Sequence, residues 1–166
     1  MSQYVEWELA FGKITKNQVT EVENEFNVKF PQDYVKIVME FDGATVNPNV
    51  FDVQGIVKVF GGLLSFTYEV EGENIVEVYK EIKDGVPSKV FPFASDPAGN
   101  YICFDYRNAE QPKIVFWEHE QAVSHEDISD EEFKNGKLEE LQEQAAIFYV
   151  ADSFSKFLTK LYGSEK

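Results

Sequence analysis

One stretch of this 166-residue chain sets its architecture: Val90-Phe91-Pro92-Phe93-Ala94-Ser95-Asp96-Pro97-Ala98-Gly99-Asn100-Tyr101-Ile102-Cys103-Phe104-Asp105-Tyr106. It holds two apolar segments, 90–94 and 100–106. The segment between them is typical of a turn, because Asp, Pro and Gly each meet a separate backbone requirement there. A third segment, Lys113–Trp117, follows a polar connection. Bulky apolar groups on both faces of 101–105 and 114–117 indicate central strands, so the second half of the chain is predicted to form a sheet.

Two short amphipathic helices are predicted before this sheet. The first runs from about Lys16 to Asn27, and Thr15 and Gln18 stand at the spacing of a capping box at its start. The second begins at Pro31, whose fixed φ suits the first turn of a helix. Gly43 follows its apolar stripe and can supply a left-handed stop.

The rest of the chain alternates between the two kinds of element. Short apolar runs separated by glycine or polar residues predict strands at 50–53, 56–60 and 63–66. Asn74 is expected to cap a third helix that ends near Gly85, and one closing helix is expected from Tyr149 to Tyr162. Between them, 124–144 is polar and acidic, with a loose helix from about Lys137. This order of elements predicts a single α+β domain over residues 1–166.

The composition excludes several classes of protein. Lys and Arg number 15 and Asp and Glu number 30, so the formal net charge is −15, which argues against binding to nucleic acid or to an anionic membrane. With 43% hydrophobic and 15% aromatic residues, the chain is too apolar for an acidic disordered tail. The start shows no secretory signal and no apolar run is long enough to span a membrane, so a reducing cytoplasm is predicted.

Motifs for catalysis are sparse. The only cysteine, Cys103, excludes an intramolecular disulfide, and its place inside an apolar strand predicts an inert, buried thiol. His119 and His125 lie near carboxylates, but six residues of helix turn through about 600°, which separates the two rings. A loop could still bring them together, which leaves a metal site as an alternative. The sequence contains neither a nucleophile elbow nor a nucleotide-binding glycine motif, and we expect no cofactor and no enzymatic activity.

The negative charge is concentrated after the strand predicted at Lys113–Trp117. No Lys or Arg occurs from Ile114 to Phe133, whereas this segment holds seven carboxylates, Glu118, Glu120, Glu126, Asp127, Asp130, Glu131 and Glu132. One interpretation is a solvated surface that keeps the protein soluble. The other is an electronegative face that steers a basic partner. By alternation, one of Phe116 and Trp117 points into the core and the other across the sheet.

Five short motifs then follow one another along the chain: 30–34 (FPQDY), 41–43 (FDG), 91–105 (FPFASD…GNYICFD), 112–119 (PKIVFWEH) and 151–158 (ADSFSKFL). Together they resemble the SUKH superfamily, which includes fungal cell-wall assembly regulators and bacterial toxin-immunity proteins. The resemblance covers a core of about 14–162. Two features depart from the pattern: Asp42 stands where the family has Asn, and the acidic stretch 124–144 is longer than is usual there.

The resemblance implies an α+β fold with a mixed, mostly antiparallel sheet of about six strands flanked by helices, and no catalysis. For a bacterial member it implies a cytoplasmic immunity protein that neutralises a cognate secreted toxin, often a nuclease, by covering its active surface. We therefore expect a basic protein partner, a toxin domain encoded nearby. The expected partner-binding residues are Asp96, Asn100, Asp105, Glu118, His119, Glu126, Asp127, Asp130, Glu131 and Glu132.

Other interpretations stay open at this point. Asn100 and Asp105 could instead satisfy backbone groups, as polar residues near turns often do. The protein could be a regulatory interaction module of the cell-wall-assembly type, or a metal-dependent enzyme that uses His119 and carboxylates. The sequence leaves the identity of the partner and the formation of homo-oligomers open.

Overall fold

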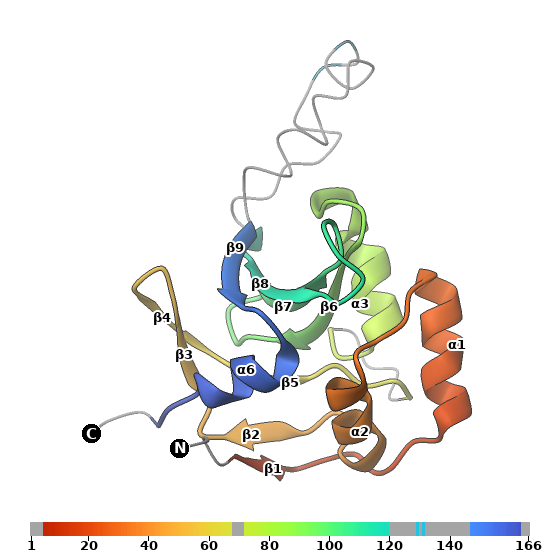
Figure 1. Cartoon of the computed structure of the whole chain (residues 1–166), viewed down its shortest axis with the longest axis vertical. Coiled ribbons are helices and arrows are strands. Elements are labelled where there is room, and N and C mark those ends of the chain that lie inside the picture. Colours follow the sequence, from red (N-terminus) through yellow and green to blue (C-terminus); the bar gives the residue numbers. More distant parts are fainter. Residues whose placement is uncertain (1–4, 68–71, 120–128, 130, 132–146, 164–166) are drawn as a thin grey trace.

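A five-stranded antiparallel sheet, in the order β5-β6-β7-β8-β9, dominates the computed structural model, which describes residues 5–67, 72–119, 129, 131 and 147–163 (Figure 1). Its strands are β5 (Gly62–Leu63), β6 (Val90–Ser95), β7 (Tyr101–Asp105), β8 (Lys113–Trp117) and β9 (Ile147–Ala151). Two smaller antiparallel sheets pair β1 (Glu6–Glu8) with β2 (Thr45–Asn47), and β3 (Val50–Val53) with β4 (Ile56–Val59). The predicted α+β fold is confirmed.

The helices are α1 (Lys16–Phe26), α2 (Gln32–Glu40), α3 (Ile75–Ile82), which continues into the 3-10 turn η1 (Lys83–Gly85), and α6 (Phe154–Thr159). The predicted capping box at the start of α1 is present: the backbone N–H of Thr15 donates to Gln18 Oε1 at 2.8 Å, and the N–H of Gln18 donates to Thr15 Oγ1 at 3.2 Å. Asn74 caps α3 as predicted. Among the described residues, no helix has the length and apolarity that crossing a membrane requires.

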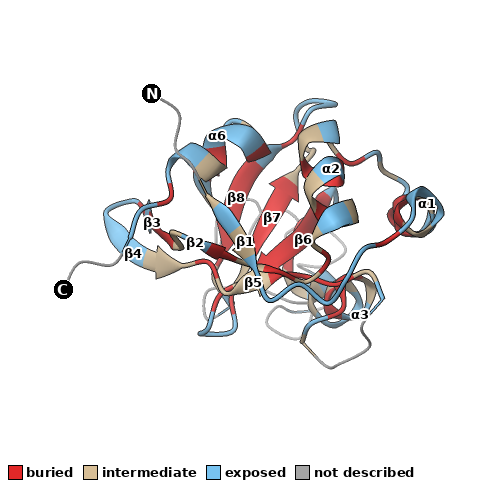
Figure 2. Ribbon diagram, turned by 90° about the horizontal axis from the view of Figure 1, so that it is seen from below, coloured by how far each residue is buried: buried red, intermediate tan, exposed pale blue. Residues whose placement is uncertain are grey.

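The sheet has two buried faces, as its bulky strand residues predicted (Figure 2). Phe116 is fully buried in the main core, which also contains residues of α1, α2 and α6. Trp117 belongs to a second apolar cluster with Val86, Val90, Cys103 and Val115, and its indole Nε1 donates to the carbonyl of Gly85 at 2.9 Å. The expectation that Phe116 and Trp117 point to opposite faces is therefore confirmed.

The prediction of one closing helix from Tyr149 to Tyr162 is wrong. Residues 147–151 form the edge strand β9, paired with β8, and the helix covers only Phe154–Thr159. Apolar residues at Val150 and Ala151 fit a strand as well as a helix, and pairing with β8 buries both. The sequence pattern fits both a strand and a helix, and only the position of β8 beside residues 147–151 decides for the strand.

Two smaller predictions are also corrected. Pro31 is the N-cap of α2, with ψ at 145°, so its extended backbone precedes the helix instead of forming the first turn. The strand expected at 63–66 is shorter and begins earlier, since its ladder with β6 covers Gly62–Leu63. The N–H of Leu64 still donates to the carbonyl of Phe93 in β6 at 2.9 Å. Beyond Leu64 the chain approaches the buried carboxylate of Asp42, whose Oδ1 accepts from the N–H of Phe66 at 2.8 Å. The strands β1 and β2 were not predicted.

Candidate partner-binding surface

The turn between β6 and β7 is built around the carboxylate of Asp96. Asp96 Oδ1 accepts hydrogen bonds from the backbone N–H groups of Ala98, at 2.9 Å, and Asn100, at 2.8 Å. Asp96 Oδ2 accepts from the side-chain amide of Asn100 at 3.1 Å. Asp96 is 8% exposed and Asn100 is 3% exposed, so these bonds are shielded from water. The turn is therefore held in one conformation by charge-assisted hydrogen bonds.

His119 fastens this turn to the end of β8. Its backbone N–H donates to Asn100 Oδ1 at 2.9 Å, and its ring Nε2 lies 3.2 Å from the carbonyl oxygen of Ala98. Three of the predicted site residues, Asp96, Asn100 and His119, are thus brought together in one network that joins the ends of β6, β7 and β8. Most of the polar atoms of this network form hydrogen bonds with one another, so these residues hold the turn in position against the end of β8.

The other two predicted residues of this region lie apart. Glu118 reaches toward the β3–β4 hairpin, where its Oε1 lies 3.5 Å from Lys58 Nζ. Asp105 lies at the opposite end of β7 and pairs with Arg107 through two hydrogen bonds of 2.9 Å. The structure therefore places Asp105 away from the turn that holds Asp96 and Asn100.

Most of the predicted acidic face lies outside the described residues: Glu126, Asp127, Asp130 and Glu132, together with His125 and the loose helix expected from about Lys137. Glu131 is described and is exposed. The ends of segment 120–146 are placed by strand register, since Trp117 pairs with both Ile147 and Tyr101. The chain thus leaves and re-enters the sheet at the end that carries the Asp96–Asn100 turn.

Within the described part of the chain, no group of three or more His, Cys, Asp or Glu side chains is placed to hold a metal ion. The metal-site alternative paired His119 with His125, which lies outside that part. The ring of His119 instead lies against the turn, as described above.

Cys103 is fully buried in the second apolar cluster, as its place in the sequence predicted. Burial raises the pKa of its thiol far above the ordinary value, and the nearby charge of Asp105 adds to this effect. Because the thiolate is the reactive form, we expect labelling by an aromatic disulfide reagent only through unfolding, about 10³-fold or more slower than for an exposed thiol. An engineered thiol at the exposed position Lys36 is the control. Equal labelling rates at the two positions would contradict the burial of Cys103.

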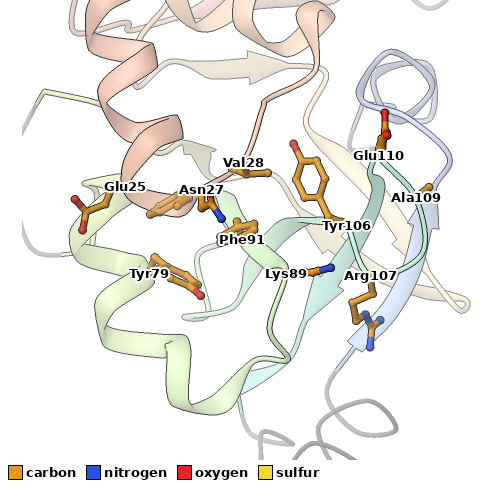
Figure 3. A pocket seen from close by; sticks show the side chains of 11 residues that line it. Glu25, Asn27, Val28, Tyr79, Lys89, Phe91, Tyr106, Arg107, Ala109 and Glu110 are labelled. Atoms are coloured by element: carbon orange, nitrogen blue, oxygen red, sulfur yellow. The ribbon is translucent and has the colours of Figure 1, made fainter.

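A cleft of about 650 Å³ lies between α1, α3 and the β7–β8 connection, and sequence reasoning missed it (Figure 3). Aromatic rings form its base: Phe91 lies 5.1 Å, between ring centroids, from both Phe26 and Tyr79. Lys89 and Glu110 are among the charged residues that line it. The lining comes from four separate segments, so neither a motif nor a period could reveal the cleft. It lies at the Asp105 end of the sheet, away from the Asp96–Asn100 turn.

Comparison with known proteins gives two findings. Residues 13–160 match the model of a family described as the SMI1 / KNR4 family (SUKH-1). A protein of Bacillus subtilis (strain 168), described as an SPbeta prophage-derived uncharacterized protein, YokK, is 24% identical to this chain over 169 residues, which cover 89% of this chain and 74% of that protein.

Proposed function

Because the chain belongs to the SMI1 / KNR4 family (SUKH-1), we propose that it is a non-enzymatic binding protein of the bacterial cytoplasm that neutralises a secreted, nuclease-type toxin by covering the toxin's active surface. One observation carries the proposal. The rigid Asp96–Asn100–His119 network lies at the sheet end where the acidic segment leaves and re-enters, in a chain of net charge −15.

A rigid turn suits a protein that covers the surface of a partner better than one that catalyses a reaction. The carboxylate of Asp96 and the amide of Asn100 bond mainly to each other and to the turn, so they hold its shape. A surface that is already ordered loses little conformational entropy on binding, which favours affinity. The acidic segment adds long-range attraction for a basic nuclease surface, because opposite charges accelerate encounter.

The relative in Bacillus subtilis supports a bacterial setting, since its description is that of a prophage-derived protein. A regulatory module of the cell-wall-assembly type is the competing function within the family. The two functions differ in the partner: an immunity protein binds a secreted toxin, whereas a regulatory module binds endogenous proteins of its own cell.

Co-expression with the product of the adjacent gene tests the proposal. We expect a large secreted protein with a basic C-terminal domain, which co-purifies with this chain in equal amounts and loses its toxic activity in the complex. A stable complex with an endogenous protein, and none with a toxin domain, would contradict the proposal and favour the regulatory module.

Reversal of the acidic face is expected to slow association with the toxin. Changing Glu126, Asp127, Asp130, Glu131 and Glu132 to lysine should lower the association rate about 10- to 10³-fold at low salt, because electrostatic steering is lost. The dissociation rate should change far less. Stopped-flow or surface-based kinetics at several salt concentrations measure both rates.

The matched control changes the same number of exposed acids on or next to the helices, Glu21, Glu40, Glu73, Glu77 and Glu81. This variant has the same net charge as the first but leaves segment 126–132 intact. Equal association rates for the two variants would show that only net charge matters, and an unchanged rate for the first variant would exclude this face.

A further inference from the structure

The β3–β4 hairpin lies at the side of the molecule opposite α1 in both views (Figures 1 and 2). Its loop is Gln54-Gly55, with φ of 51° and 82°, which is the backbone of a tight hairpin turn with positive φ at both central residues. β4 pairs with β3 along Ile56–Val59. On its other side, β4 has no strand partner in the part of the chain that the structure describes.

The alternation of hydrogen-bonded and non-hydrogen-bonded pairs along the hairpin shows which backbone groups of β4 point outward. The N–H of Phe60 donates to the carbonyl of Asn49 at 2.8 Å, so these two residues form a hydrogen-bonded pair. Because hydrogen-bonded and non-hydrogen-bonded pairs alternate along an antiparallel ladder, Val59 and Val57 occupy non-hydrogen-bonded positions. Their N–H and C=O groups therefore point away from β3, in the arrangement that a further strand requires.

The two edges of the main sheet are protected, whereas the outer side of β4 has no strand beside it among the described residues. At one edge β5 is only two residues long, and the N–H of Leu63 donates to the carbonyl of Ala44 at 2.8 Å. At the other, Lys160 Nζ donates to the carbonyl of Val150 in β9 at 2.6 Å. β4 instead exposes 60% of Ile56 and 62% of Val57. Proteins ordinarily block an apolar edge of this kind, and open edges serve as docking sites for strands.

Carboxylates lie on both faces of this edge. On the face of Ile56 and Lys58, a pocket of about 80 Å³ opens beside Glu118, one of the predicted partner-binding residues. On the opposite face, the exposed Asp52 is the cross-strand neighbour of Val57. An added strand would thus meet the exposed apolar side chains of Ile56 and Val57. It would also meet the carboxylate of Asp52 on one face and the Glu118–Lys58 ion pair on the other.

We propose that β4 is the docking edge for an extended strand of the toxin, one that combines β-branched with lysine or arginine side chains. The inference rests on the proposed function and names the mode by which the partner is held. The net charge of −15 favours a basic strand over a second copy of this chain, which would bring the same negative net charge to the edge.

The first test needs no toxin. A short peptide that alternates lysine and valine is titrated into the isotope-labelled protein, and amide exchange is followed by NMR. We expect the amides of Val57 and Val59 to gain protection, while that of Lys58, already bonded within the hairpin, changes little. The same peptide with alternate N-methyl groups, and one that alternates glutamate and valine, should not protect them. No protection by the first peptide, or equal protection by all three, would overturn the inference.

The second test uses the co-purified toxin domain and two variants. Val57→Pro removes an outward N–H that the β3–β4 ladder does not use, and Val57→Lys adds a charge that opposes a basic strand. Each should weaken toxin binding about tenfold or more, whereas Val57→Thr, which keeps the N–H, should change it little. Circular dichroism verifies the folding of each variant.

The outcomes separate this inference from the proposed function. Tight toxin binding that is unchanged by Val57→Pro and Val57→Lys overturns the docking edge and leaves the immunity function standing. A dimer that sedimentation detects in the native protein and not in Val57→Pro identifies a second copy as the occupant, and also overturns the inference. Failure to bind any toxin contradicts the proposed function, even if the peptide protects Val57 and Val59.

Discussion

Replacing Asp96 by alanine is expected to lower the free energy of unfolding by about 4 kcal/mol, because a buried carboxylate with three donors is lost. Each hydrogen bond to a charged group contributes about 1.5–3 kcal/mol, and each buried donor left without a partner costs about 1–3 kcal/mol. These terms overlap, so their sum is an upper bound. Urea unfolding followed by circular dichroism measures the loss, and a fall in Tm of about 10 °C should accompany it.

The control is Asp96→Asn. An asparagine oxygen can still accept from the backbone N–H groups of Ala98 and Asn100, but the hydrogen bond that the Asn100 side-chain amide donates to Asp96 Oδ2 is lost. We expect a smaller loss, about 1–2 kcal/mol. If Asp96→Ala cost less than about 1 kcal/mol, the network would not hold the turn. The rigid platform of the proposed function would then have no basis.

Asp42→Ala is expected to destabilise the protein by about 3 kcal/mol, because it removes a second buried carboxylate that accepts hydrogen bonds. Asp42 is 1% exposed, and its Oδ2 accepts from the hydroxyl of Ser65 at 2.6 Å, while its Oδ1 accepts from the N–H of Phe66 at 2.8 Å. These bonds hold the chain that follows β5 against the end of α2. The same unfolding measurement applies, and amide exchange should show new opening around Phe66.

Asp42→Asn is the informative control, because asparagine is the residue that the family motif carries at this position. Its side-chain oxygen can accept from the N–H of Phe66, and its NH₂ can donate to the hydroxyl oxygen of Ser65. We expect a loss of about 1 kcal/mol or less. A loss as large as that of the alanine variant would mean that the charge itself, rather than hydrogen bonding, stabilises this junction.

The candidate site was only partly accessible to sequence reasoning. Turn chemistry and the family resemblance singled out Asp96, Asn100 and His119, and the structure brings these three together. The same reasoning grouped Asp105 with them, although the length of β7 separates Asp105 from the turn. The aromatic cleft carries no motif, because its residues become neighbours only after folding. The position of β4 at an edge depends on which strands lie beside it in the folded chain.

Local chemistry in the sequence determined the elements whose stability is local. The capping box at Thr15, the Asn74 cap of α3 and the apolar strands around 90–117 follow from residue spacing alone. The acidic composition argues against binding to nucleic acid or to an anionic membrane. Tertiary structure alone decided the rest. Residues 147–151 form a strand because their backbone pairs with β8 and the side chains of Val150 and Ala151 are buried there. β4 is an open edge because no described strand pairs with its outer side. Backbone hydrogen bonds between distant segments have no periodicity in the sequence, so only the folded chain reveals them.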